Sequence, residues 1–259
     1  MALLTNTKVV ISDMMGYVMR TKRPKYLFIL SHMRSRSSVL SHILGSNDGI
    51  CGYSELQHSY IQYTDLMQLK EDLYDDLKCN FRGKYLLDKL LHNELVISKE
   101  VFETASPKII FLLRTPESSI KSIVNMGYFS GMDWYRTPEN ALEYYCRRLE
   151  HLAMYAEIFD GDAFFLESDD LLNNTDQVLR TLTEWLNLHT SLVNRYRKFN
   201  HTGKSGCGDR SENIQTGRLI KTKGYPDIEI PPEVLQVAES SYNKCKTILC
   251  ANINMRIIK

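Results

Sequence analysis

Two arginines and four serines crowd into one short segment, SHMRSRSS, at residues 31–38. The guanidinium groups of Arg34 and Arg36 carry full positive charge and can donate forked hydrogen bonds to a phosphate or sulfate group. The hydroxyls of Ser35, Ser37 and Ser38 can add further donors. We therefore predict that this segment binds a phosphate- or sulfate-like anion. The alternative is a helix start at which serines cap the backbone while the arginines stay in water.

A second arginine–serine pair occurs in FLLRTPESSIKS, residues 111–122. Arg114 ends an apolar run, and Ser122 lies eight residues later, which is just over two turns of helix. On a helix that begins at Pro116, Ser122 can face back toward Arg114, so the pair could clamp a second anion. The alternative is an ordinary ion pair for Arg114 and an ordinary helix position for Ser122.

Apolar runs alternate with helix-period segments along the chain, and these elements must position the arginines and serines. Short apolar runs predict strands at 26–31, 85–87, 108–113 and 163–166. Apolar residues at helical spacing predict helices at 35–44, from 116 onward, and at 138–159, 174–186 and 232–249. Strands that alternate with helices form a parallel sheet covered on both faces, and ligands bind beyond the carboxyl ends of its strands. We therefore predict one α/β domain over residues 1–259, with a long loop at 201–224.

The composition is that of an ordinary globular protein, with 43% hydrophobic residues, 24% charged residues and a net charge of +1. This balance gives no reason to expect nucleic acid or an anionic membrane as a partner. No segment approaches the ~20 apolar residues of a membrane span, and residues 1–25 lack the basic start and unbroken apolar core of a signal peptide. The six cysteines are scattered and form no CxxC pair, so we expect reduced thiols in a cytoplasmic protein.

Taken in order, these segments resemble sulfotransferases that use 3′-phosphoadenosine-5′-phosphosulfate (PAPS). MRSRSS, residues 33–38, resembles the family's loop for the 5′-phosphosulfate, with Arg34 at the position of a catalytic Lys or Arg. Arg36 stands where many members have glycine. RTPESSIKS, residues 114–122, resembles the strand end and helix that bind the 3′-phosphate, and AFFLESDDLL, residues 163–172, resembles a later strand followed by acidic residues.

The segment HTGKSGCGDRSENIQTGRL, residues 201–219, is similar to a glycine-bearing segment that closes over the nucleotide in some bacterial members. On this resemblance, Gly217 and Arg218 are expected to contact the nucleotide. The resemblance also implies a three-layer fold like that of P-loop nucleotide hydrolases, PAPS as the sulfuryl donor, and no metal. Arg34 is expected to stabilise the leaving phosphate. The other residues expected to bind the donor are Ser35, Arg36, Ser37, Ser38, Arg114 and Ser122.

Sulfuryl transfer to a hydroxyl also needs a base for the hydroxyl proton, and the resemblance implies a Glu or a His. The candidates lie in GYSELQHSY, residues 52–60, where Glu55 and His58 are three positions apart and could share a helical face. Glu55 is preferred because it resembles a Glu that follows the first strand–helix unit in several bacterial members, and His58 stays open. Asp88 and Lys89 are expected to line the site.

The resemblance implies a cytoplasmic sulfotransferase that transfers the sulfuryl group of PAPS directly to a hydroxyl of a small molecule. The acceptor that we expect is a natural product such as a hydroxylated, toxin-type alkaloid, and a carbohydrate acceptor stays open. We expect no nucleic acid and no membrane as partners, while a homodimer stays open.

Two other functions also stay open. One is a P-loop nucleotide kinase or NTPase, although residues 24–44 contain no glycine and therefore no Walker A motif. The other is a non-catalytic nucleotide-binding protein, which would tolerate the loss of Arg34 and Glu55.

Overall fold

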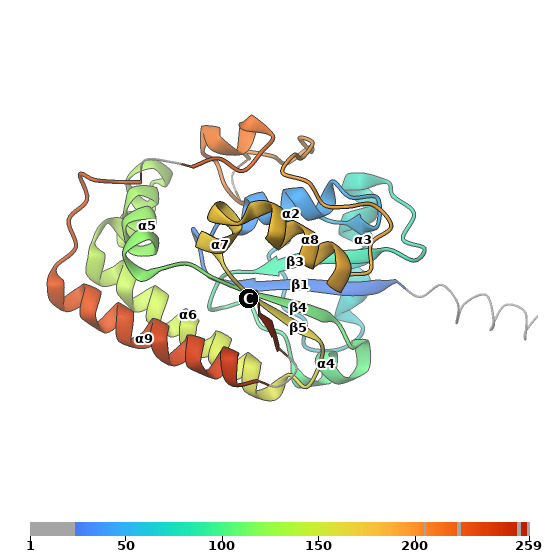
Figure 1. Ribbon diagram of the computed structural model, residues 1–259, viewed down its shortest axis with the longest axis horizontal. Coiled ribbons are helices and arrows are strands. Elements are labelled where there is room, and N and C mark those ends of the chain that lie inside the picture. The colour runs from blue at the N-terminus through green and yellow to red at the C-terminus, as the bar shows by residue number, and fades with distance from the viewer. Residues whose placement is uncertain (1–23, 205, 222–223, 253–254, 258–259) are drawn as a thin grey trace, which may run out of the picture.

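The computed structural model describes residues 24–204, 206–221, 224–252 and 255–257. The expectation about a signal peptide concerns residues 1–25, of which 1–23 lie outside the described residues. Within the described part of the chain, six parallel strands form one sheet in the order β2-β3-β1-β4-β5-β6 (Figure 1). The strands are β1 (Lys25–Ser31), β2 (Ile50–Cys51), β3 (Tyr85–Leu90), β4 (Lys108–Leu113), β5 (Ala163–Glu167) and β6 (Met255–Ile257).

Helices cover both faces of this sheet. They are α2 (Ser37–Gly45), α3 (Asp65–Leu77), α4 (Lys99–Ala105), α5 (Pro116–Ser130), α6 (Pro138–Ile158), α7 (Ser168–Asn173), α8 (Thr175–Trp185) and α9 (Pro232–Ala251). Short 3₁₀ turns are η1 (Asp133–Arg136) and η2 (Glu212–Thr216). Figure 1 shows α2, α7 and α8 above the strands and α6 and α9 below them. The prediction of a three-layer α/β fold with a central parallel sheet is confirmed.

The alternation of side chains along β1 divides the core between the two faces. Leu27 and Ile29 pack with α2, α7 and α8, whereas Phe28 and Leu30 pack with α3, α4, α5, α6 and α9. All four side chains are fully buried. A strand that is buried on both faces reads as a continuous apolar run, which is why β1 and β4 could be predicted from the sequence.

The segment between β1 and α2 departs from the prediction. Helix α2 begins at Ser37 and not at Ser35, because Arg36 has a left-handed backbone with φ 70° and forms the helix cap. Strand β3 continues past the predicted Leu87 to Leu90. The strand is buried along its whole length. Its last residues include Asp88 and Lys89, whose polar side chains interrupt the apolar run from which a buried strand is predicted.

The expectation of reduced thiols is wrong for one pair, because Cys51 and Cys79 form a disulfide. The two residues are 28 positions apart in sequence, and their Cα atoms are 7.0 Å apart. Spacing along the chain could not show this pair, since a disulfide depends on proximity in the folded chain. Disulfides are more typical of oxidising compartments, so the cysteines do not support a cytoplasmic location, which stays a prediction. The other four cysteines are free.

Candidate functional site

The carboxyl ends of the strands gather the polar residues that were singled out in the sequence. Residues 31–38, called the anion loop below, connect β1 to α2. Within this loop Ser31 Oγ donates to Leu112 O of β4 at 2.5 Å and lies 2.7 Å from Ser35 Oγ. Arg34 and Arg36 on either side of Ser35 have φ values of 62° and 70°. Left-handed backbone at two arginines costs free energy, and such strain is concentrated at functional sites.

Arg34 lies at the centre of the anion loop's contacts. Its Nε donates to Ser122 Oγ of α5 at 3.1 Å, and its Nη1 lies 3.0 Å from Asp209 Oδ1. The sequence placed Arg34 and Ser122 in two separate anion sites, but the fold brings them into direct contact. Helix α5 begins at Pro116, and this start places Ser122, buried in its second turn, against the anion loop.

Arg114 directly follows β4 and lies next to the same loop. Its Nη1 donates to Arg34 O at 2.8 Å, and its backbone N–H donates to His32 Nε2 at 3.0 Å. Burial, together with the positive charges of Arg36 and Arg34, lowers the pKa of Arg114 to about 10. Its Nε is buried and has no hydrogen-bond partner among the described residues. A buried, unpartnered N–H group surrounded by other cations is what an anion-binding site requires.

Arg36 is held by the first turn of α7, which directly follows β5. Its Nη1 donates to Ser168 Oγ at 2.8 Å and lies 2.8 Å from Asp169 Oδ1. The acidic residues after β5 therefore bind an arginine of the anion loop. A role for Arg36 in binding a nucleotide stays a prediction.

Ser38 and Lys89 connect the anion loop to a second group of polar side chains. Lys89 lies in β3 and is fully buried. Its Nζ donates to Ser38 Oγ at 2.9 Å and lies 4.0 Å from Glu55 Oε2. Burial lowers the pKa of Lys89, whereas the carboxylates of Glu55 and Asp88 oppose this shift. Glu55 Oε1 lies 3.0 Å from His92 Nε2, at an angle that does not make a hydrogen bond. We define Lys89, Glu55 and His92 as the acid–base cluster.

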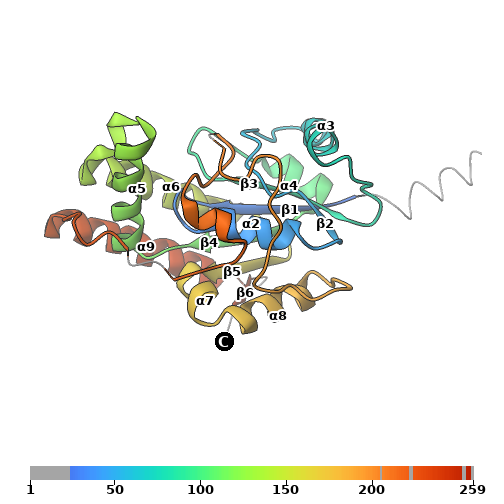
Figure 2. The ribbon, with the colours of Figure 1, turned by 90° about the horizontal axis from the view of Figure 1, so that it is seen from above.

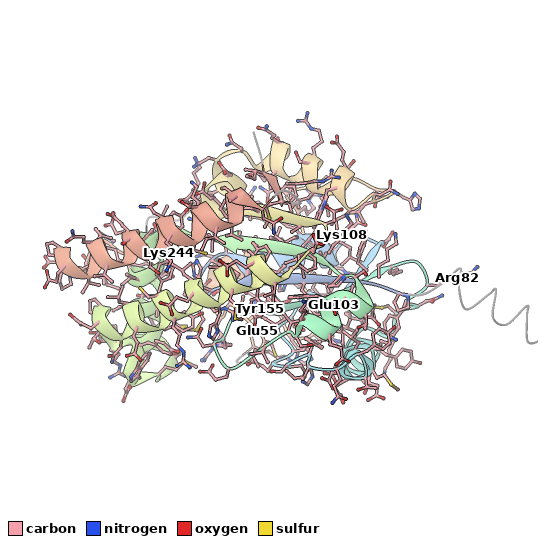
Figure 3. All side chains as sticks on the ribbon, turned by 90° about the horizontal axis from the view of Figure 1, so that it is seen from below. Glu55, Arg82, Glu103, Lys108, Tyr155 and Lys244 are labelled. Atoms are coloured by element: carbon pink, nitrogen blue, oxygen red, sulfur yellow. A yellow bond between two sulfur atoms is a disulfide. The ribbon has the colours of Figure 1, made fainter. Side chains whose placement is uncertain are left out.

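Asp88 holds the segment that carries Glu55. Its carboxylate accepts hydrogen bonds from Leu56 N at 3.1 Å and from the Tyr60 hydroxyl at 2.7 Å. Burial raises the pKa of Asp88 to about 6, despite these two hydrogen bonds. Figure 3 shows Glu55 well apart from Arg82, which precedes β3, so Glu55 lies toward the other end of this strand.

The other base candidate, His58, points elsewhere. Its Nε2 bonds to Asp72 of α3, and its side chain is 32% exposed. Gln57 between the two candidates has φ 62°, so residues 55–58 are not helical and the expected shared face does not form. The structure therefore brings Glu55, but not His58, to Lys89.

His32, which follows β1, holds the backbone of its neighbours. Its Nδ1 lies 2.9 Å from Met33 O, and its Nε2 accepts from Arg114 N. Burial lowers the pKa of His32 to about 3, so the ring is neutral. Arg148 of α6 is also fully buried, and it donates to the carbonyl groups of Ser31, Leu90 and His92 at the ends of β1 and β3.

Comparison with known proteins gives a fold but no sequence match. No known protein-family profile matches the chain, and no curated protein sequence matches it. A sulfotransferase domain from the curacin biosynthetic pathway superposes with a TM-score of 0.63 at 17% identity, over 87% of this chain and 98% of its own. A sulfotransferase domain from the Synechococcus PCC 7002 olefin synthase gives a TM-score of 0.55 at 18% identity, over 85% of this chain and 95% of its own. The fold is a sulfotransferase fold.

In this sulfotransferase fold, the loop after Tyr196 returns to the anion loop, and Figure 2 shows the orange segment lying across α2. Asp209 N–H donates to Ser38 Oγ at 3.0 Å. Gly217, with φ 72°, ends η2 and accepts at its carbonyl from Tyr196 N. Arg218 is exposed, and among the described residues its side chain makes no hydrogen bond or ion pair with the anion loop. Nucleotide binding by Gly217 and Arg218 stays a prediction.

Sequence reasoning missed two members of this site. His92 was not considered, and Asp209 lies 175 residues from Arg34 in sequence. The signal for His92 was available, because a lysine and a histidine three positions apart follow the expected strand at 85–87. Asp209 carried no local signal, since its position depends on the return of a long loop.

Two kinds of feature are absent from the described residues. No helix there combines the length and apolar character needed to cross a membrane. No cluster of three or more His, Cys, Asp or Glu side chains there is placed to hold a metal ion.

Proposed function

We propose that this protein is a sulfotransferase that moves the sulfuryl group of PAPS to a hydroxyl of a small-molecule acceptor. The fold it shares with the two sulfotransferase domains supports the reaction class. The observation that carries the proposal is the placement of the unpartnered, buried Nε of Arg114 beside the contact between Arg34 and Ser122. Arg114 and Ser122 are the pair that, on the resemblance to PAPS-dependent sulfotransferases, are expected to bind the 3′-phosphate of the donor.

The two groups of polar residues divide the proposed reaction between them. On the donor side, the first turn of α2 and the guanidinium of Arg34 would bind the 5′-phosphosulfate, because backbone N–H groups and the helix dipole favour an anion there. On the acceptor side lies the buried carboxylate of Glu55, in contact with His92. Lys89 joins the two sides through Ser38.

Sulfuryl transfer then needs one bond to form and one to break. The acceptor oxygen forms a bond to sulfur, the bond between sulfur and the 5′-phosphate oxygen breaks, and the hydroxyl proton passes to Glu55. Arg34 and Lys89 would stabilise the charge that develops on the departing phosphate oxygen, which is worth roughly 100-fold in rate for one such donor. His92, whose Nε2 lies 3.0 Å from Glu55 Oε1, would help to position Glu55.

The acceptor that we propose is a natural product such as a hydroxylated, toxin-type alkaloid. The two solved domains come from a curacin biosynthetic pathway and an olefin synthase, which supports a biosynthetic acceptor more than a carbohydrate. The choice among such acceptors requires a screen of hydroxylated compounds.

Calorimetric binding of adenosine 3′,5′-bisphosphate (PAP), compared with ATP and magnesium, tests the donor. We expect binding of PAP and weak or no binding of ATP, because the proposal assigns the 3′-phosphate of the donor to Arg114. Binding of ATP with magnesium and none of PAP would replace the sulfotransferase by the nucleotide kinase or NTPase. Conversion of PAPS to PAP that depends on an added hydroxyl acceptor, and its loss in Arg34→Ala, would exclude a non-catalytic nucleotide-binding protein.

A further inference from the structure

The carboxylate of Asp209 lies against the residue that we assign to the phosphosulfate. Arg34 Nη1 is 3.0 Å from Asp209 Oδ1, and the same guanidinium donates through Nε to Ser122. The side chains of Arg34 and Asp209 are only 20% and 19% exposed. Water screens such a pair much less than it screens a pair on the surface.

The backbone next to Asp209 contacts the remaining groups of the same site. Asp209 N–H and Lys89 Nζ both donate to Ser38 Oγ, at 3.0 and 2.9 Å. Gly208 has φ 126°, and a Cβ built on it would lie 2.8 Å from Ser38 Oγ and 2.9 Å from Lys89 Nζ. Only a glycine allows the chain to come this close. Residues 208–209 therefore contact Arg34, Ser38 and Lys89, which are three groups of the proposed transfer site.

Asp209 acts on this site as an anion. Burial raises the pKa of its carboxyl group, but Arg34 and the N–H of Ser211 lower it by more, so its pKa lies below the usual value. The Ser211 N–H donates to Oδ1 at 3.0 Å and the Ser211 hydroxyl donates to Oδ2 at 2.8 Å. Asp209 thus presents an ordered carboxylate to Arg34.

We propose that Asp209 is a latch, meaning a carboxylate that holds Arg34 until the phosphosulfate of the donor displaces it. This inference rests on the proposed function, because that function identifies the displacing anion. The exchange replaces one anion on Arg34 by another, and it moves residues 206–211 away from Ser38 and Lys89. This movement is opposite to the closing over the nucleotide that the resemblance implies for residues 201–219. Donor binding is therefore coupled to the opening of this loop, and part of the donor's binding free energy is spent in breaking the contacts of the latch.

The rival explanation is that Asp209 positions Arg34 throughout turnover. The two explanations predict opposite changes in donor affinity when the negative charge of Asp209 is removed. A latch competes with the donor, so its removal strengthens donor binding. A positioning partner supports the donor's contacts, so its removal weakens donor binding and slows turnover.

The variant Asp209→Asn keeps the size of the side chain and removes its charge. We expect its dissociation constant for PAP, measured by calorimetry, to be at least ~5-fold lower than that of the wild type, because the competing contact is lost. The matched control is Asp169→Asn, which removes a carboxylate that lies 2.8 Å from Arg36 but belongs to α7 and not to the loop. We expect no comparable tightening there, and equal tightening in both variants would show a general charge effect and overturn the latch.

Tryptic cleavage after Arg210, an exposed residue beside the latch, measures the loop itself. We expect saturating PAP to speed this cleavage in the wild type, and we expect Asp209→Asn to be cleaved quickly without PAP. Slower cleavage with PAP, together with weaker PAP binding by Asp209→Asn, would show that Asp209 is a positioning partner. If the wild type binds PAP and Asp209→Asn binds it no tighter, the latch proposal is refuted while the proposed function stands. If neither protein binds PAP, the proposed function fails, and with it the identity of the displacing anion.

Discussion

Replacement of Arg114 by lysine tests whether this residue reads the 3′-phosphate of the donor. Arg114 donates through Nη1 to Arg34 O, and its buried Nε has no partner among the described residues. Lysine keeps the positive charge and can reproduce one hydrogen bond. It lacks the planar fork that lets arginine bind the protein and a phosphate oxygen at the same time.

The size of the effect follows from the one buried donor that is lost. A hydrogen bond to a charged group contributes about 1.5–3 kcal/mol. Since each 1.4 kcal/mol corresponds to about a factor of ten, we expect Arg114→Lys to bind PAP roughly 10- to 150-fold more weakly. Adenosine 5′-monophosphate lacks the 3′-phosphate, so we expect its affinity to change by less than about 3-fold.

Calorimetry with both nucleotides, on wild type and on Arg114→Lys, separates recognition from structural damage. Thermal unfolding of the variant provides the control for its stability. An equal loss of affinity for both nucleotides would refute the reasoning, because Arg114 would then act only by holding the backbone of Arg34. Unchanged affinity for PAP would place the 3′-phosphate elsewhere.

Three further predictions concern the base, a buried carboxyl group and the disulfide. We expect Glu55→Gln to lower kcat about 100- to 10,000-fold with little change in PAP affinity. In the same sulfation assay, we expect the kcat of His58→Asn to stay near that of the wild type. An equal loss of kcat in both variants would contradict the assignment of Glu55 as the base. Because burial raises the pKa of Asp88 to about 6, ionisation of this group destabilises the folded state as pH rises from about 4 to about 6. In urea unfolding, Asp88→Asn should therefore gain about 2 kcal/mol relative to wild type between pH 4 and pH 7. A constant difference would show that Asp88 does not titrate in this range. Thiol labelling of the denatured, unreduced protein should modify four cysteines, because Cys51 and Cys79 are paired. Six labelled cysteines without reductant would exclude the pair. Reduction of the disulfide should lower the free energy of unfolding by about 2–4 kcal/mol.

Much of the fold was predictable because its central strands are buried on both faces. The run KIIFLL has the same bounds as β4, and the prolines at 116 and 138 mark the starts of α5 and α6. The anion loop was also predictable, since arginines and serines at a strand–helix junction are local in sequence. Short elements such as β2 and β6 were not predictable, because two or three residues carry no period.

The base candidates show where local rules fail. The i, i+3 argument for Glu55 and His58 assumed a helix, but the left-handed backbone at Gln57 turns the two side chains in different directions. The contacts that decide between them come from β3 and α3, at Lys89 and Asp72. No pattern within residues 52–60 contains that information.

The sequence by itself determined the elements, their order and the loop that can bind an anion, because hydrophobic period and helix-start chemistry act over a few neighbouring residues. Only the tertiary structure decided which side chains from other parts of the chain contact that loop. Ser122, Lys89 and Asp209 reach Arg34 and Ser38 from 51 to 175 positions away in sequence. Such contacts depend on strand order in the parallel sheet and on the return of a long loop, and both are set by the packing of the whole core.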